Sequence, residues 1–171
     1  MSMRAGETVI QTDALSKRYG RVQARVFAQR CVALVIGIVT LMAAVGAALW
    51  IFSALLGMGL GLGAIASGAA ALGLFGLFAG AVAIAVGAAT GSAATARGLA
   101  ALAAVVSYLI NALAQITSVL RPARPVSPYY LVLGNEPLAH GLRLIGAVSV
   151  LGVAVILAVA GGILFARRDL S

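Results

Sequence analysis

Long runs of apolar residues, interrupted by short polar links, dominate the chain. No charged side chain occurs from Cys31 to Ala96, and further apolar runs follow up to Phe165. Because about 20 apolar residues cross a bilayer as a helix, the pattern predicts an all-α, polytopic integral membrane protein. Four spans are expected at approximately residues 31–52, 64–90, 99–120 and 142–165.

The segment Ser53–Ala64 separates the first two runs and has an unusual glycine pattern. Gly57, Gly59, Gly61 and Gly63 alternate with larger apolar residues. Glycine weakens a helix by roughly 1 kcal/mol per residue, so we interpret the segment as a short outer turn. The alternative is a further helix, which would give five spans.

The distribution of basic residues decides the expected orientation. Six lie before the first span and two follow the last: Arg4, Lys17, Arg18, Arg21, Arg25 and Arg30, then Arg167 and Arg168. Since basic loops stay in the cytoplasm, both termini are expected there, which requires an even number of spans. Arg97 falls on the same side, whereas Arg121, Arg124 and Arg143 fall outside and oppose the rule.

These boundaries divide the chain into two parts. Residues 1–30 are predicted to form a cytoplasmic basic tail that ends in an amphipathic helix. Residues 31–171 form the transmembrane domain, with an outer loop at 121–141. The first span has the length of an uncleaved anchor rather than a signal peptide, so we expect a multi-pass protein of the cell membrane.

Composition and charge indicate which class of molecule the chain is expected to contact. Hydrophobic residues make up 63% of the chain and charged residues 9%, with a net charge of +8. The charge alone would suit nucleic acid, but the basic residues flank apolar spans, where they meet lipid headgroups. The bilayer is therefore the expected partner, not nucleic acid. Cys31 is the single cysteine, permits no internal disulfide, and is interpreted as a packing residue.

All four prolines lie in a single segment, from Pro122 to Pro137. Proline disfavours helix at its own position and at the residue before it. The segment should therefore end the third span and stay non-helical until the fourth. Asn135 and Pro137 resemble the cap and first position of a short surface helix.

The third span carries a polar stripe at helical spacing: Ser107, Asn111, Gln115 and Ser118. Amides are costly in hydrocarbon unless they find partners, so the stripe should face inward. It is either a seam of interhelical hydrogen bonds or the lining of a substrate path or subunit interface. Two G-x-x-x-G pairs, Gly76/Gly80 and Gly87/Gly91, indicate close helix packing or, alternatively, dimerisation.

Candidate chemistry is sparse. None of the four acids, Glu7, Asp13, Glu136 and Asp169, falls within a predicted span, which argues against proton coupling. The only lysine, Lys17, is followed by arginine, so the chain has no nucleotide-binding P-loop. One His and one Cys make no metal pattern. We expect no catalytic site and no cofactor.

An ordered set of features from about Ala66 to the end resembles the permease subunits of ATP-binding-cassette (ABC) transporters, in the type-2 exporter class. The features are GAVAIAVGAATGSAATARGLA, a span with a basic link; YLINALA, the polar part of the next span; VSPYYLVLGNEPLAHGL, the outer loop; and the basic terminus FARRDLS. The link has Arg97 alone where the family commonly has adjacent basic residues.

The N-terminal stretch TVIQTDALSKRYGRV resembles instead the opening of a cassette ATPase subunit. This resemblance implies a strand at Thr8–Leu15 and an adenine-stacking aromatic at Tyr19, although no later ATPase motif follows. One hypothesis is a gene that joins the start of an ATPase to the last four of a permease's usual six spans. The other is a polar tail with an accidental likeness.

The resemblance implies a permease component, whole or truncated, energised by a separate ATPase and paired with another permease chain. The docking candidates are Arg25, Arg30 and Arg97. The outer-gate candidates are Ser127, Pro128, Tyr129, Tyr130 and Pro137. The alternatives are a small four-span structural or assembly protein, or a remnant without transport. A membrane enzyme is the weakest interpretation.

Overall fold

The computed structural model describes the backbone of residues 5–168 and the side chains of residue 25 and residues 28–165. Every regular element in this part is helical. The elements are α1 (Ala5–Leu55), α2 (Leu62–Thr90), α3 (Ala93–Ile116), the 3-10 helix η1 (Ser118–Val126), α4 (Pro128–Val132), α5 (Pro137–His140) and α6 (Leu144–Arg168).

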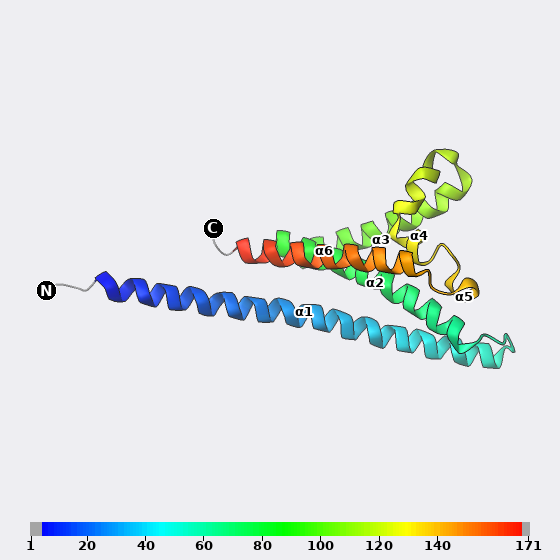
Figure 1. The fold of residues 1–171 in the computed structure, drawn as a ribbon, viewed down its shortest axis with the longest axis horizontal. Coiled ribbons are helices and arrows are strands. Elements are labelled where there is room, and N and C mark those ends of the chain that lie inside the picture. The colour runs from blue at the N-terminus through cyan, green and yellow to red at the C-terminus, as the bar shows by residue number, and fades with distance from the viewer. Residues whose placement is uncertain (1–4, 169–171) are drawn as a thin grey trace.

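Four of these helices are long and apolar enough to cross a membrane. The candidate spans are Ala28–Leu55, Leu62–Thr90, Ala93–Ile116 and Leu144–Phe165, which confirms the predicted all-helical class and four spans. They run alternately up and down, so both ends of the described chain and the α2–α3 link lie at one end of the bundle (Figure 1). We call it the inner end, because its basic residues predict a cytoplasmic position.

The N-terminal tail is helical along its whole described length. α1 begins at Ala5 and continues without a break through the basic segment into the first span. At about 1.5 Å per residue, it is roughly 75 Å long. The strand implied at Thr8–Leu15 is therefore wrong: no proline breaks the run, and helix propagates readily from the apolar span once a turn has formed. The side chain of Tyr19 lies outside the described part.

A short turn joins α1 to α2, as the glycine pattern predicts. Gly57 and Gly59 both adopt φ +63°, a conformation that glycine takes without steric cost. The buried Ser53 hydroxyl accepts a 3.0 Å hydrogen bond from the Leu60 amide and closes the turn. Because α1 extends to Leu55 and α2 starts at Leu62, the segment holds no helix of its own and adds no fifth span.

Helix α2 lies at the centre of the bundle and contacts α1, α3 and α6. Its seam with α1 is built from apolar side chains that enter glycine gaps. A Cβ atom at Gly80 would lie 2.5 Å from Leu34 Cδ1, and one at Gly73 would overlap the Met42 side chain. Gly76, between them, faces Ile38. The Gly76/Gly80 pair thus serves packing within the chain.

The second glycine pair forms the link between α2 and α3. Gly91 ends α2 with φ +68°, and its amide donates to the Gly87 carbonyl. Ser92 then caps α3 by accepting a bond from the Thr95 amide. A Cβ at Gly87 would be 3.5 Å from Ala96 of α3, an ordinary van der Waals contact, so a side chain as small as alanine would fit beside the link.

The buried core lies where the outer segment meets the bundle. It comprises Ala71 and Phe78 of α2, Val132 of α4 and Val150 of α6. At Gly146 of α6 a Cβ would collide with the backbone carbonyl of Leu131. The short helix α4 is therefore seated directly on the backbone of α6, and it fixes the outer segment to the membrane helices.

Candidate functional site

The proline segment folds into an ordered cap over the outer end of α3 and α6, which we define as residues 117–143 (Figure 1). The predicted non-helical loop is wrong here, because the cap contains η1, α4 and α5. Pro122 and Pro125 lie inside the 3-10 helix, and Pro128 and Pro137 occupy the first positions of α4 and α5. The first position of a helix needs no amide donor, so proline fits there.

The third span ends earlier than predicted. α3 stops at Ile116, and the Thr117 amide and hydroxyl both donate to the Leu113 carbonyl. The first proline comes only at position 122, so it does not terminate α3 by itself. The Leu113 carbonyl therefore accepts two hydrogen bonds from Thr117 at the helix end.

Two buried serines hold the cap against α3. Ser107 and Ser127 are 4% and 2% exposed. The Ser127 hydroxyl donates to the Ser107 carbonyl at 2.7 Å. A hydroxyl has one proton, so in the 3.0 Å contact between the two Oγ atoms Ser107 is the donor. Ser107 Oγ accepts from the Tyr129 amide at 2.9 Å. Each hydroxyl therefore both donates and accepts, and we call this pair the serine clasp.

A second polar contact lies nearer the surface. Arg124 Nε donates to Asn111 Oδ1 at 3.2 Å, and the Arg124 guanidinium carbon is 4.4 Å from the centre of the Tyr130 ring. Asn111 is 5% exposed. The contact gives the buried amide oxygen a charged donor and places the cation over an aromatic face. Arg124, which opposes the positive-inside rule, thereby joins the cap to α3.

Aromatic contacts extend the attachment to α2. Tyr129 packs edge-to-face against Tyr108 of α3, with ring centres 5.2 Å apart, and against Phe75 of α2, with centres 5.6 Å apart. Such arrangements add roughly 0.5–1.5 kcal/mol each beyond burial. Tyr129 therefore joins α2, α3 and α4 at a single point.

The structure separates the predicted polar stripe into two halves. Ser107 and Asn111 are buried and bonded to the cap, whereas Gln115 and Ser118 are exposed. Ser118 lies beyond the end of α3, so helical spacing no longer governs its direction. The first half forms a hydrogen-bonded seam with the cap, whereas Gln115 and Ser118 do not face the interior of this chain; a path or subunit interface stays a prediction for them.

The remaining outer-gate candidates have structural positions in the cap. Ser127 caps α4, and Pro137 is buried. Glu136, with φ 50°, takes the cap position of α5 that was predicted for Asn135. Arg124 was not predicted, because its contact with Asn111 depends on the path of the chain after α3, which spacing along a helix does not encode.

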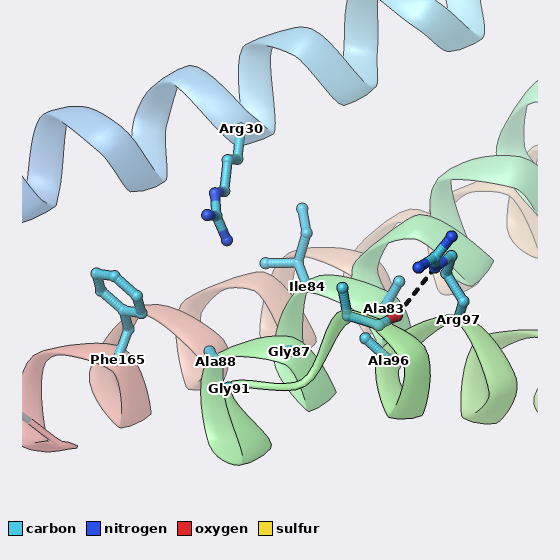
Figure 2. A pocket seen from close by; sticks show the side chains of 10 residues that line it. Arg30, Ala83, Ile84, Gly87, Ala88, Gly91, Ala96, Arg97 and Phe165 are labelled. Atoms are coloured by element: carbon cyan, nitrogen blue, oxygen red, sulfur yellow. Dashed lines mark hydrogen bonds between the residues drawn. The ribbon is translucent and has the colours of Figure 1, made fainter.

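At the inner end, a pocket of about 350 Å³ lies where four helices meet. Arg30 of α1 points into it and Arg97 of α3 borders it, with Ile84 of α2 between them and Phe165 of α6 on the other side of Arg30 (Figure 2). Arg97 Nε donates to the Ala93 carbonyl at 3.1 Å. Two of the three docking candidates therefore share one pocket. The third candidate, Arg25, is exposed on α1, five residues before Arg30 in the chain.

No protein-family model matches the chain, and no match was found among curated proteins or solved structures. The four apolar helices show a multi-pass membrane architecture.

Proposed function

We propose that the chain is the membrane-spanning permease component of an ABC exporter of the plasma membrane, energised by a separate ATPase subunit. The observation that carries the proposal is the folded cap between the last two spans. The Ser-Pro-Tyr-Tyr sequence that resembles the family's outer loop is the part that contacts α3 through the serine clasp and α2 through Tyr129. A structured closure between spans suits an outer gate.

The inner end supplies the surface for the ATPase. The α2–α3 link, Arg25, Arg30 and Arg97 lie on this side of the bundle, and α1 continues beyond the span as a helix. Basic residues at this position complement an acidic face on a soluble partner. ATP binding and hydrolysis belong to that partner, since the sequence lacks a P-loop.

A second permease chain completes the proposed transporter. In the most apolar stretch of the α1 span, 6% of the residues are buried within the chain, compared with 28% for the α2 span. Most of the α1 surface is therefore open to lipid or to another membrane helix. A partner chain against α1 would enclose a path between two copies of the bundle, and rearrangement of the spans would open it alternately to either side.

The decisive experiment is purification of the tagged full chain from native membranes in a mild detergent, followed by mass spectrometry. Recovery of a cassette ATPase in near-equal amount supports the proposal. Charge-removing changes at Arg25, Arg30 and Arg97 should lower this recovery, whereas Arg121→Gln, at the opposite end, should leave it unchanged. Abundant chain without any ATPase would refute the transport proposal.

The second candidate is a four-span structural or assembly protein. It is favoured by the cap itself, because no buried side-chain nitrogen or oxygen atom in the described part lacks a hydrogen-bond partner. A fully bonded cap suits a static role as well as a gate. Cross-linking α4 to α6 separates the two: a gate would lose transport when locked, whereas a structural protein would keep its partners and its function.

A further inference from the structure

The pocket at the inner end combines charge at its mouth with an apolar floor. Arg30 and Arg97 provide the cations, and the residues beneath them are Ala83, Ile84, Gly87 and Ala88 of α2. Among the residues that the structure describes, no acidic side chain lines it. An anion is therefore the complementary ligand, and the floor provides room for an apolar group attached to it.

Depth in the membrane identifies the kind of anion. Arg30 is the third residue of the candidate span Ala28–Leu55, and Arg97 lies in the first turns of the span Ala93–Ile116. Both belong at the level of lipid headgroups. Ala83 lies seven residues before the end of α2 at Thr90, which is roughly 10 Å deeper along the helix axis. The pocket thus extends from the headgroup level into the hydrocarbon.

The two arginines line opposite sides of the pocket, with Ile84 between them (Figure 2). Arg97 Nε is bonded to the Ala93 carbonyl, which fixes the guanidinium over the first turn of α3 and leaves its terminal Nη groups as donors. Arg30 extends from α1 toward α2, into the part of the pocket between Phe165 and Ile84 (Figure 2). The first turn of α3 adds the positive end of its helix dipole, since Ala93 also lines the pocket.

We infer that this pocket binds the phosphate of an anionic phospholipid of the inner leaflet, with an acyl chain along the α2 floor. Basic pockets between transmembrane helices on the cytoplasmic side are typical sites for such headgroups. The bound lipid would fill the space between α1 and the other helices at the inner end. The inference depends on the pocket and not on the proposed transport, and it stands even if no ATPase binds.

The test is a lipid titration of the purified full chain in detergent micelles, followed by native mass spectrometry. The probes are phosphatidylglycerol, phosphatidylcholine with matched acyl chains, and inorganic phosphate. Phosphatidylglycerol should bind with the highest affinity, and phosphate should not displace it. A basic residue near a membrane surface contributes about 1 kcal/mol, so Arg30→Gln and Arg97→Gln should each weaken binding about fivefold.

Matched variants keep the test specific. The pair Arg30→Lys and Arg97→Lys should retain most of the binding, and Arg121→Gln should leave it unchanged. Near-ultraviolet circular dichroism checks that each variant is folded. Equal binding of the two lipids, or equal loss in Arg121→Gln, would overturn the inference. Displacement by inorganic phosphate at similar affinity would also overturn it, since the ligand would then be a free anion.

ATPase recovery separates this inference from the proposed function. If the double Gln variant loses phosphatidylglycerol but still recovers the ATPase, the pocket is a lipid site distinct from the docking surface. If it loses the ATPase and keeps the lipid affinity of the unchanged chain, the arginines recognise a protein and the lipid inference fails.

Discussion

The serine clasp provides a quantitative test of how the cap is attached. In Ser127→Ala, the cap loses the 2.7 Å donation to the Ser107 carbonyl and the acceptor for the Ser107 hydroxyl. Both serines are almost fully buried, so water does not replace these bonds. At about 1 kcal/mol for each hydrogen bond, and a similar amount for the lost helix cap, the variant should be destabilised by roughly 2–3 kcal/mol.

Ser107→Ala should cost about 2 kcal/mol, because Ser107 donates to Ser127 Oγ and accepts from the Tyr129 amide. The bond between the two hydroxyls is lost in either variant. The double variant should therefore be more stable than the sum of the single changes predicts, by about 1 kcal/mol. This coupling energy is the distinctive prediction, since two independent sites would give none.

The measurement is unfolding by titration with sodium dodecyl sulfate in mixed micelles. Three of the chain's four tyrosines, Tyr108, Tyr129 and Tyr130, belong to the cap or its contacts, so near-ultraviolet circular dichroism reports on this region. Ser149→Ala is the control, because Ser149 is exposed and its hydroxyl bonds within its own helix. A coupling energy within about 0.3 kcal/mol of zero would refute the clasp, since that is the scatter expected for independent sites.

Three further changes test the packing and the topology. Gly146→Ala should destabilise the fold by about 1–3 kcal/mol, because the added methyl group meets the Leu131 carbonyl. Gly152→Ala on the same helix has open space around the added methyl group and should be neutral or stabilising. Unfolding by sodium dodecyl sulfate measures both. Asn111→Leu should cost about 1 kcal/mol by removing the side-chain acceptor of Arg124 Nε, and Gln115→Leu should cost almost nothing; equal effects would contradict the split stripe. In a Cys31→Ser background, Ala139→Cys should react with an impermeant thiol reagent from outside intact cells and Ala94→Cys should not; the reverse labelling would invert the assigned orientation.

The membrane helices were predictable because the bilayer imposes a simple length rule. Apolar runs of sufficient length have no stable alternative to helix in hydrocarbon, and alternating glycines mark the turn after Leu55. The predicted edges differ from the structure by a few residues. At α3 the difference arises because Thr117 caps the helix before the apolar run ends at Leu120.

The site was less predictable because its contacts connect distant segments. Polar spacing placed Ser107 and Asn111 on one face, and both are buried. It did not reveal that Ser127 and Arg124 are their partners, since these lie beyond the end of the helix. The N-terminal strand failed for a different reason. The strand was inferred only from a short sequence resemblance. The adjoining span is a stable helix, and extending an existing helix into the tail is easier than starting a separate strand.

The position of α2 suggests how the two ends of the bundle communicate in the proposed exporter. Its outer part carries Phe75, which packs on Tyr129 of the cap, and its inner part carries Gly87, which lines the basic pocket. These residues are about 18 Å apart on one continuous helix. Against α1, α2 presents Gly73 and Gly80, whose gaps the Met42 and Leu34 side chains fill. A displacement imposed at the inner end would therefore move α2 as a unit and reach the cap through Tyr129. The serine clasp would resist that movement, because it attaches the cap to α3 instead.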